Sequence, residues 1–115
     1  MALVAATRLY RFRAVHSLNT GTHREQLHGH EYALEISTSR SDWKGLDEML
    51  NSWVHSQLEG RDLSILVEHA TGEVLVEWIH ERLAASPIGP DLLGVALQET
   101  RKNRFVSARS NGHLL

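Results

Sequence analysis

Two histidines separated by one residue are the feature of this sequence with the clearest chemical meaning. His28 and His30 flank Gly29 in the segment LHGHEYALEI. In a β-strand, side chains two residues apart point to the same face, and their Cα atoms lie about 6.5–7 Å apart. Two imidazoles placed in this way can bind one divalent cation at metal–nitrogen distances of about 2.0–2.1 Å. The pair therefore predicts part of a metal site, provided that the segment is a strand.

A third histidine could complete this site. His16 ends an alternating segment, and in a hairpin it would lie beside the start of the second strand, on the same face as His28 and His30. Three neutral imidazoles with an open fourth position are the ligand set of a catalytic zinc. We therefore expect these three residues to bind Zn²⁺. The alternative is a chance pair, because the chain contains eight histidines.

The hydrophobic pattern predicts the elements that must position these side chains. Four segments alternate apolar and polar residues, as half-buried strands do: residues 4–16, 28–37, 91–99 and 103–109. Two segments follow the spacing of amphipathic helices, residues 43–58 and 71–86, with a loop expected over 60–71. The order ββααββ predicts an α+β fold, in which a four-stranded antiparallel sheet carries both helices on one face.

Composition limits the class of protein. A length of 115 residues predicts a single domain, 1–115, and 12 basic against 14 acidic residues argue against nucleic acid as a partner. The absence of cysteine excludes a thiolate metal site and a cysteine nucleophile. No apolar run reaches the roughly 20 residues that span a bilayer, and the N-terminal residues do not read as a secretory signal. We expect a cytoplasmic protein that acts on a small-molecule substrate and has no membrane partner.

Longer motifs extend the histidine pattern. They are FRAVHSL, QLHGHEYALEI, a helix opened by DW, ATGEVLVEWI and a late strand ending in LQET. Together they closely resemble the 6-pyruvoyl-tetrahydropterin synthase and 6-carboxy-tetrahydropterin synthase family over residues 8–100. The resemblance implies the tunnelling fold, with trimers or hexamers whose sheets form a barrel. It also maps the zinc ligands of the family onto His16, His28 and His30.

The resemblance further implies where a substrate would bind. The pterin-anchoring glutamate of the family maps onto Glu99, which shares a face with Leu93, Val95 and Leu97 in the predicted strand, and Thr100 follows it. A carboxylate can accept two hydrogen bonds from a guanidine-like edge such as that of a pterin. We therefore expect Glu99 and Thr100 to contact substrate.

The chain departs from the family where the proton relay should be. Arg24 stands at the position of the usual cysteine, and the family's L-D-H-x-x-L-N segment reads LEGRDLS, with Glu59 and Gly60 in place of the aspartate and histidine. We therefore expect a zinc-dependent lyase or cyclase that uses a different acid/base, acting on a pterin or on another small carbonyl or hydroxyl compound. The alternative is an inactive family member that binds zinc and a pterin-like ligand or a protein partner.

Four residues are candidates for the replacement acid/base. Glu25 lies three residues before His28, and a subgroup of the family uses a glutamate in this neighbourhood. His23 could carry a proton, because imidazole titrates near neutral pH. Glu59 and Asp62 occupy the region of the lost aspartate–histidine pair. Arg24 could instead hold an anionic group of the substrate.

Overall fold

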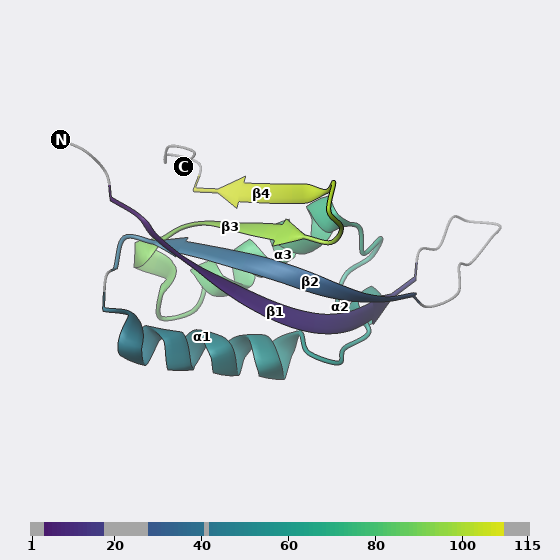
Figure 1. Cartoon of the computed structure of the whole chain (residues 1–115), viewed down its shortest axis with the longest axis horizontal. Helices are drawn as coiled ribbons and strands as arrows, with labels where there is room; N and C mark the ends of the chain where they lie inside the picture. Colours follow the sequence, from purple (N-terminus) through teal and green to yellow (C-terminus); the bar gives the residue numbers. More distant parts are fainter. Residues whose placement is uncertain (1–3, 18–27, 41, 110–115) are drawn as a thin grey trace.

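The chain folds as a four-stranded antiparallel sheet with its helices on one face. The computed structural model describes residues 4–17, 28–40 and 42–109. Its elements, in chain order, are β1 (Ala6–His16), β2 (His28–Thr38), α1 (Trp43–Gln57), α2 (Leu63–Leu66), α3 (Gly72–Ala84), the 3₁₀ turn η1 (Gly89–Asp91), β3 (Leu92–Gln98) and β4 (Arg104–Ala108). The strands lie in the order β1-β2-β3-β4, with α1 below β1 and α3 behind β3 in Figure 1. The predicted ββααββ order is confirmed.

The first two strands form the hairpin that the alternation predicts. They pair antiparallel along their whole length, from Ala6 opposite Thr38 to His16 opposite His28. Ala14 lies opposite His30 in this register. The histidine-bearing ends of β1 and β2 are therefore brought together at the same end of the sheet (Figure 1).

The core fills the space between the sheet and the helices. Side chains from alternate strand positions meet the apolar faces of α1 and α3; the buried contributors include Phe12, Tyr32, Leu34, Ile36, Leu46, Leu50, Val54, Leu75, Ile79 and Leu83. The opposite face of the sheet carries charged pairs, in which Arg11 and Arg13 contact Glu31. One face of β1 and β2 is thus apolar and the other is ionic, as the sequence pattern predicts.

Two details differ from the expectation. The predicted loop over 60–71 contains the short helix α2, whose four residues are too few to produce a helical apolar period. The strand face is also shifted at the start of β3, where Leu92 rather than Leu93 is buried. A register irregularity between Ser37 and Thr38 inserts one extra residue opposite β2, which changes the inward position.

No helix in residues 4–17, 28–40 or 42–109 is long and apolar enough to cross a membrane.

Candidate metal centre

Three side chains that could bind a metal ion converge where β1, β2 and β3 come together. His16 ends β1, His30 lies near the start of β2, and Glu99 follows the last residue of β3. Glu99 Oε1 lies 3.6 Å from His16 Nε2 and 3.5 Å from His30 Nε2. One ligand atom from each residue can be chosen so that all three lie within 4.8 Å of one another. Residues distant in sequence thus form one compact set of metal-type donors.

Two of the three separations among these donors match those around a tetrahedral cation. Ligand atoms about 2.1 Å from a tetrahedral zinc ion lie about 3.4 Å from one another. Both measured separations, 3.5 and 3.6 Å, are close to this value. They are longer than the roughly 2.7–3.2 Å of an ordinary N–H···O hydrogen bond. The two imidazoles and the carboxylate are therefore placed as ligands of a shared ion would be.

Packing of the neighbouring strand residues holds the two rings together. Ala14, a small residue, lies opposite His30 in the strand pairing. The rings of His16 and His30 have centroids 4.8 Å apart, and His30 meets the edge of Tyr32 at 5.9 Å. Tyr32 in turn stacks on Phe12 at 5.0 Å. The aromatic core thus forms the floor of the candidate centre.

The hydroxyl of Tyr32 is part of this floor. Its oxygen is buried, and within the described residues it has no hydrogen-bond partner. Burial, and to a lesser extent the negative charge of Glu99, raises the pKa of Tyr32 far above its usual value. The phenol therefore stays neutral beside the carboxylate at physiological pH.

His16 is oriented by a backbone group that the sequence does not reveal. Its Nδ1 lies 3.0 Å from the carbonyl oxygen of Ala70, and because a carbonyl only accepts, Nδ1 carries the proton and donates. In the neutral ring, the lone pair of Nε2 then faces the candidate centre. This is the orienting hydrogen bond typical of metal-binding histidines.

The turn before α3 brings that carbonyl into place. His69 has a φ of 55°, in the left-handed region, and Ala70 is buried. A contact of 2.7 Å from Thr71 N to His69 O tightens the same turn. Sequence reasoning missed Ala70 because its contribution comes from the main chain, for which residue type gives no signal.

Several predicted site residues fall outside the described part of the chain. His28 lies in β2, paired with His16 through the backbone register, but its side chain is not described. His23, Arg24 and Glu25 lie in 18–27, outside the described residues. Their assigned roles stay predictions.

Glu59 lies against the outer edge of β1 and binds its main chain. Its Oε2 accepts a hydrogen bond of 2.7 Å from Arg13 N, and Gly60 N donates to Arg13 O at 2.7 Å. Gly60 has a φ of 70°, which favours glycine over any residue with a side chain. The Gly60 position, where the family pattern has histidine, thus serves a tight backbone contact here. Within the described residues, Glu59 does not join the donor cluster.

Asp62 is also occupied by a structural contact. Its carboxylate accepts from Ser64 N at 3.0 Å and caps α2. Ser64 Oγ in turn lies 2.6 Å from Ser17 N and 3.1 Å from Ser17 O. These contacts fix the position of Ser17, the residue that follows His16. The sequence could not predict them, because no motif surrounds Ser17 and Ser64.

Glu99 and Thr100 separate at the end of β3. The side chain of Glu99 is 17% exposed and joins the histidines. Thr100 is exposed, and its Oγ1 accepts contacts of 3.3 and 3.2 Å from Lys102 N and Asn103 N in the turn to β4. The structure therefore brings Glu99, but not the hydroxyl of Thr100, into the candidate centre.

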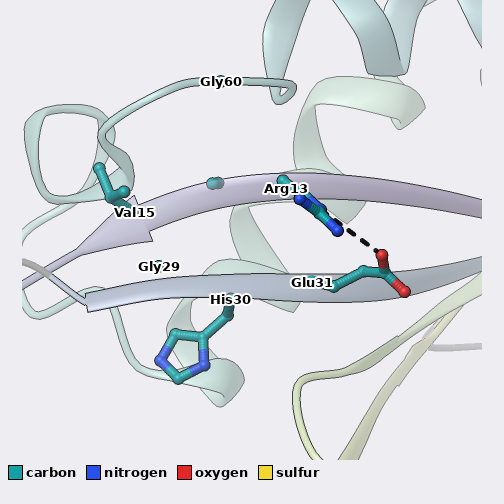
Figure 2. A pocket seen from close by; sticks show the side chains of 7 residues that line it. Arg13, Val15, Gly29, His30, Glu31 and Gly60 are labelled. Carbon is teal, nitrogen blue, oxygen red and sulfur yellow. Dashed lines mark ion pairs between the residues drawn. The ribbon is translucent and has the colours of Figure 1, made fainter.

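A hollow of about 440 Å³ lies over the same ends of β1 and β2. In Figure 2, Arg13 and Glu31 extend toward each other across its floor, whereas the imidazole of His30 points away from the Gly60 segment. Strand alternation explains this, because odd and even positions point to opposite faces. The hollow is therefore on the ionic side of the sheet, behind the donor cluster.

A comparison with protein-family models identifies the family. The family model described as 6-pyruvoyl tetrahydropterin synthase matches residues 5–110. A search of curated protein sequences finds no match to this chain.

Solved structures show the same fold. The 6-pyruvoyl tetrahydropterin synthase of Caenorhabditis elegans is 22% identical and superimposes with a TM-score of 0.77, covering 96% of this chain and 98% of that chain. An uncharacterized protein from Wolinella succinogenes is 15% identical, with a TM-score of 0.70 and coverage of 93% and 98%.

A third similar structure is that of a variant with a substituted catalytic residue. It is the Plasmodium vivax 6-pyruvoyltetrahydropterin synthase, described as a catalytic residue mutant in which a glutamate is replaced by alanine. It is 15% identical to this chain, with a TM-score of 0.67 and coverage of 92% and 98%. These likenesses confirm the fold, and the match over residues 5–110 shows that the chain belongs to the 6-pyruvoyl tetrahydropterin synthase family.

Proposed function

We propose that the protein is a zinc-dependent enzyme of lyase type that acts on the side chain of a pterin. The observation that carries this proposal is the convergence of His16 Nε2, His30 Nε2 and Glu99 Oε1 at the end of the sheet. His28 supplies the third imidazole of the proposed ligand set, since it stands opposite His16 in the hairpin. When bound, zinc would act as a Lewis acid that polarises a carbonyl or hydroxyl oxygen of the substrate.

Glu99 is proposed to recognise the substrate. Its carboxylate is partly buried, and a buried carboxylate discriminates strongly in favour of ligands that donate two parallel hydrogen bonds. The N–C–NH₂ edge of a pterin offers such a donor pair. Another small molecule with this edge would satisfy the same carboxylate, which makes the choice of substrate an experimental question.

The proton is proposed to move through the segment that precedes β2. Glu59 and Asp62 already accept backbone hydrogen bonds, which makes them poorer candidates than Glu25 and His23. A carboxylate that is partly shielded from water can have its pKa raised into the working range of a general base. The catalytic glutamate named for the Plasmodium vivax enzyme supports the choice of Glu25.

Assembly is proposed to follow from the two outer strands. β1 and β4 end the sheet on either side, and each exposes an apolar side chain, Leu9 and Val106, at 51%. Among the described residues, the main-chain contacts of residues 59–62 with β1 lie near Arg13 and Val15, which leaves the earlier part of that edge for another chain. Pairing of β1 with β4 of the next copy would close a barrel, and light scattering should then give the mass of a trimer or hexamer. A monomer at micromolar concentration would contradict this.

Turnover tests the enzyme against the inactive alternative. The zinc-loaded protein is incubated with 7,8-dihydroneopterin triphosphate, and the products are separated by chromatography. We expect turnover that His28→Ala and Glu25→Gln abolish, and that Glu31→Gln, a change on the opposite face of the sheet, leaves intact. Full zinc occupancy without turnover of this compound, or of a panel of related carbonyl compounds, would contradict the enzyme. It would instead favour an inactive family member that binds zinc and a ligand. Glu59 and Gly60, which replace the usual acid/base pair, are consistent with that alternative.

A further inference from the structure

We propose that Glu99 is itself a ligand of the metal ion while no organic molecule is bound. This inference rests on the proposed metal centre and adds a second role to a residue for which family resemblance implies only substrate anchoring. The same oxygen atom, Oε1, faces both imidazole nitrogens, at 3.6 Å for His16 and 3.5 Å for His30.

The distances distinguish ligation from a hydrogen-bonded pair. A carboxylate that held an imidazole proton would lie about 2.7–2.9 Å from the ring nitrogen, the range for charge-assisted bonds. Two separations near 3.5 Å instead match the edges of a tetrahedron around zinc, which are about 3.4 Å long. Moreover, Nδ1 of His16 donates to Ala70 O, which directs the other ring nitrogen toward the carboxylate.

Burial and charge favour the same assignment. The side chains of His16, His30 and Glu99 are 9%, 30% and 17% exposed. A divalent ion held there by neutral imidazoles alone would keep its full charge in a site of low dielectric, which is costly. The carboxylate of Glu99 lowers that net charge. A set of histidines and one glutamate is moreover a known type of zinc ligand set.

Ligation by Glu99 has a consequence for binding. A carboxylate cannot present both oxygens to a guanidine-like edge while one of them is bound to the metal. A ligand that engages Glu99 in this bidentate way would therefore release it from the ion and open a coordination position for the reacting oxygen. The resting site is closed by the same residue that recognises the substrate.

Zinc affinity of the full chain, without substrate, tests the inference. Dissociation constants are measured by competition with a chromophoric chelator for wild type, Glu99→Gln, His30→Ala and the charge-matched control Glu31→Gln. Glu31 neighbours His30 but points to the ionic face, where it contacts Arg11 and Arg13. We expect Glu99→Gln to weaken zinc binding by at least about 100-fold, beyond the usual effect of residues that merely orient ligands, and Glu31→Gln by less than about threefold.

The visible spectrum of the Co²⁺-substituted protein supplies an independent readout of the coordination sphere. Its ligand-field bands should shift in Glu99→Gln and stay unchanged in Glu31→Gln. Circular dichroism checks folding, and Glu99→Asp, which withdraws the carboxylate by one methylene, should show the same changes if Glu99→Gln does not fold.

The outcomes separate this inference from the proposed function. Wild-type affinity and an unchanged cobalt spectrum in Glu99→Gln, with binding lost in His30→Ala, would overturn ligation by Glu99 and leave the histidine centre intact. Wild-type affinity in His30→Ala as well would overturn both.

Discussion

Two polar groups involve side chains of β1, and their contacts differ in kind. Near the start of the strand, Tyr10 OH donates to Asp47 at 2.7 Å, and Arg8 contacts the same carboxylate at 3.0 and 3.3 Å. At its end, His16 meets Glu99 at 3.6 Å. The first group consists of complete hydrogen bonds and ion pairs. In the second, the Glu99 carboxylate faces the Nε2 atoms of His16 and His30 at 3.5–3.6 Å, beyond the usual hydrogen-bond distance.

The difference separates structural polar groups from candidate chemistry. Tyr10 and Asp47 join β1 to α1, and each satisfies the other. Glu59 and Asp62 resemble them, because their carboxylates accept backbone N–H groups at 2.7 and 3.0 Å. His16, His30 and Glu99 instead bring one metal-type donor atom each to within 4.8 Å of the others. A carboxylate at a motif position is thus weak evidence for catalysis until its hydrogen bonds are known.

Removal of a histidine from the end of β1–β2 should have the largest effect. His30→Ala deletes one donor, and we expect zinc affinity to fall by at least about 100-fold, beyond the usual effect of residues that only orient ligands. Calorimetric titration of zinc into the purified protein measures this change.

The matched control is His55→Ala, which removes an exposed histidine from α1. It should bind zinc as wild type does. Zinc should also raise the melting temperature of wild type and His55→Ala but not of His30→Ala, because a ligand that binds only the folded state stabilises it. If His30→Ala and His55→Ala bound zinc with equal affinity, the histidine group at the end of β1 would be no more a metal site than the Tyr10–Asp47 group near its start.

Replacement of Asp62 should affect stability and not metal binding. Asp62→Ala removes the cap of α2, and such a loss costs about 1 kcal/mol. Urea denaturation measures the free energy of unfolding, and the zinc titration should be unchanged. A variant with wild-type stability and weakened zinc binding would instead move Asp62 into the metal centre.

The contribution of Asp47, near the start of β1, to stability should depend on pH. The hydrogen bond from Tyr10, and then the contact with Arg8, hold the pKa of Asp47 below its ordinary value of 3.8, although partial burial opposes them. A carboxyl whose pKa is lower in the folded state contributes stability above its ordinary pKa and loses it as pH falls through the folded value. The stability difference between wild type and Asp47→Asn should therefore be constant above about pH 5 and shrink below pH 4.

Urea unfolding at pH 3 to 7 checks this dependence, with Glu48→Gln, a neighbouring change on α1, as the control. A difference that is the same at every pH would show that ionisation of Asp47 does not contribute.

Much of the fold could be predicted because its patterns are long. Alternation from Tyr10 to His16 defines the later part of β1, and the same parity placed His16 and His30 on one face. α2 could not be predicted, since four residues carry no period. The burial of Leu92 instead of Leu93 depends on a register irregularity in the pairing of β2 with β3.

The site was predictable only in part, for a different reason. Side-chain types and spacing pointed to the histidines and to Glu99. The carbonyl of Ala70 that orients His16 comes from a turn 54 residues away, and no side chain marks it. The backbone contact of Glu59 likewise arises from a loop that packs on the edge of β1. Such contacts depend on tertiary structure and not on local sequence.

Anomalous diffraction at the zinc edge, from crystals of the zinc-loaded protein, tests the central claim most directly. We predict one strong peak about 2.1 Å from Nε2 of both His16 and His30, on the helix-facing side of the sheet. A map with no peak between these rings, or with zinc bound only elsewhere on the chain, would contradict the account.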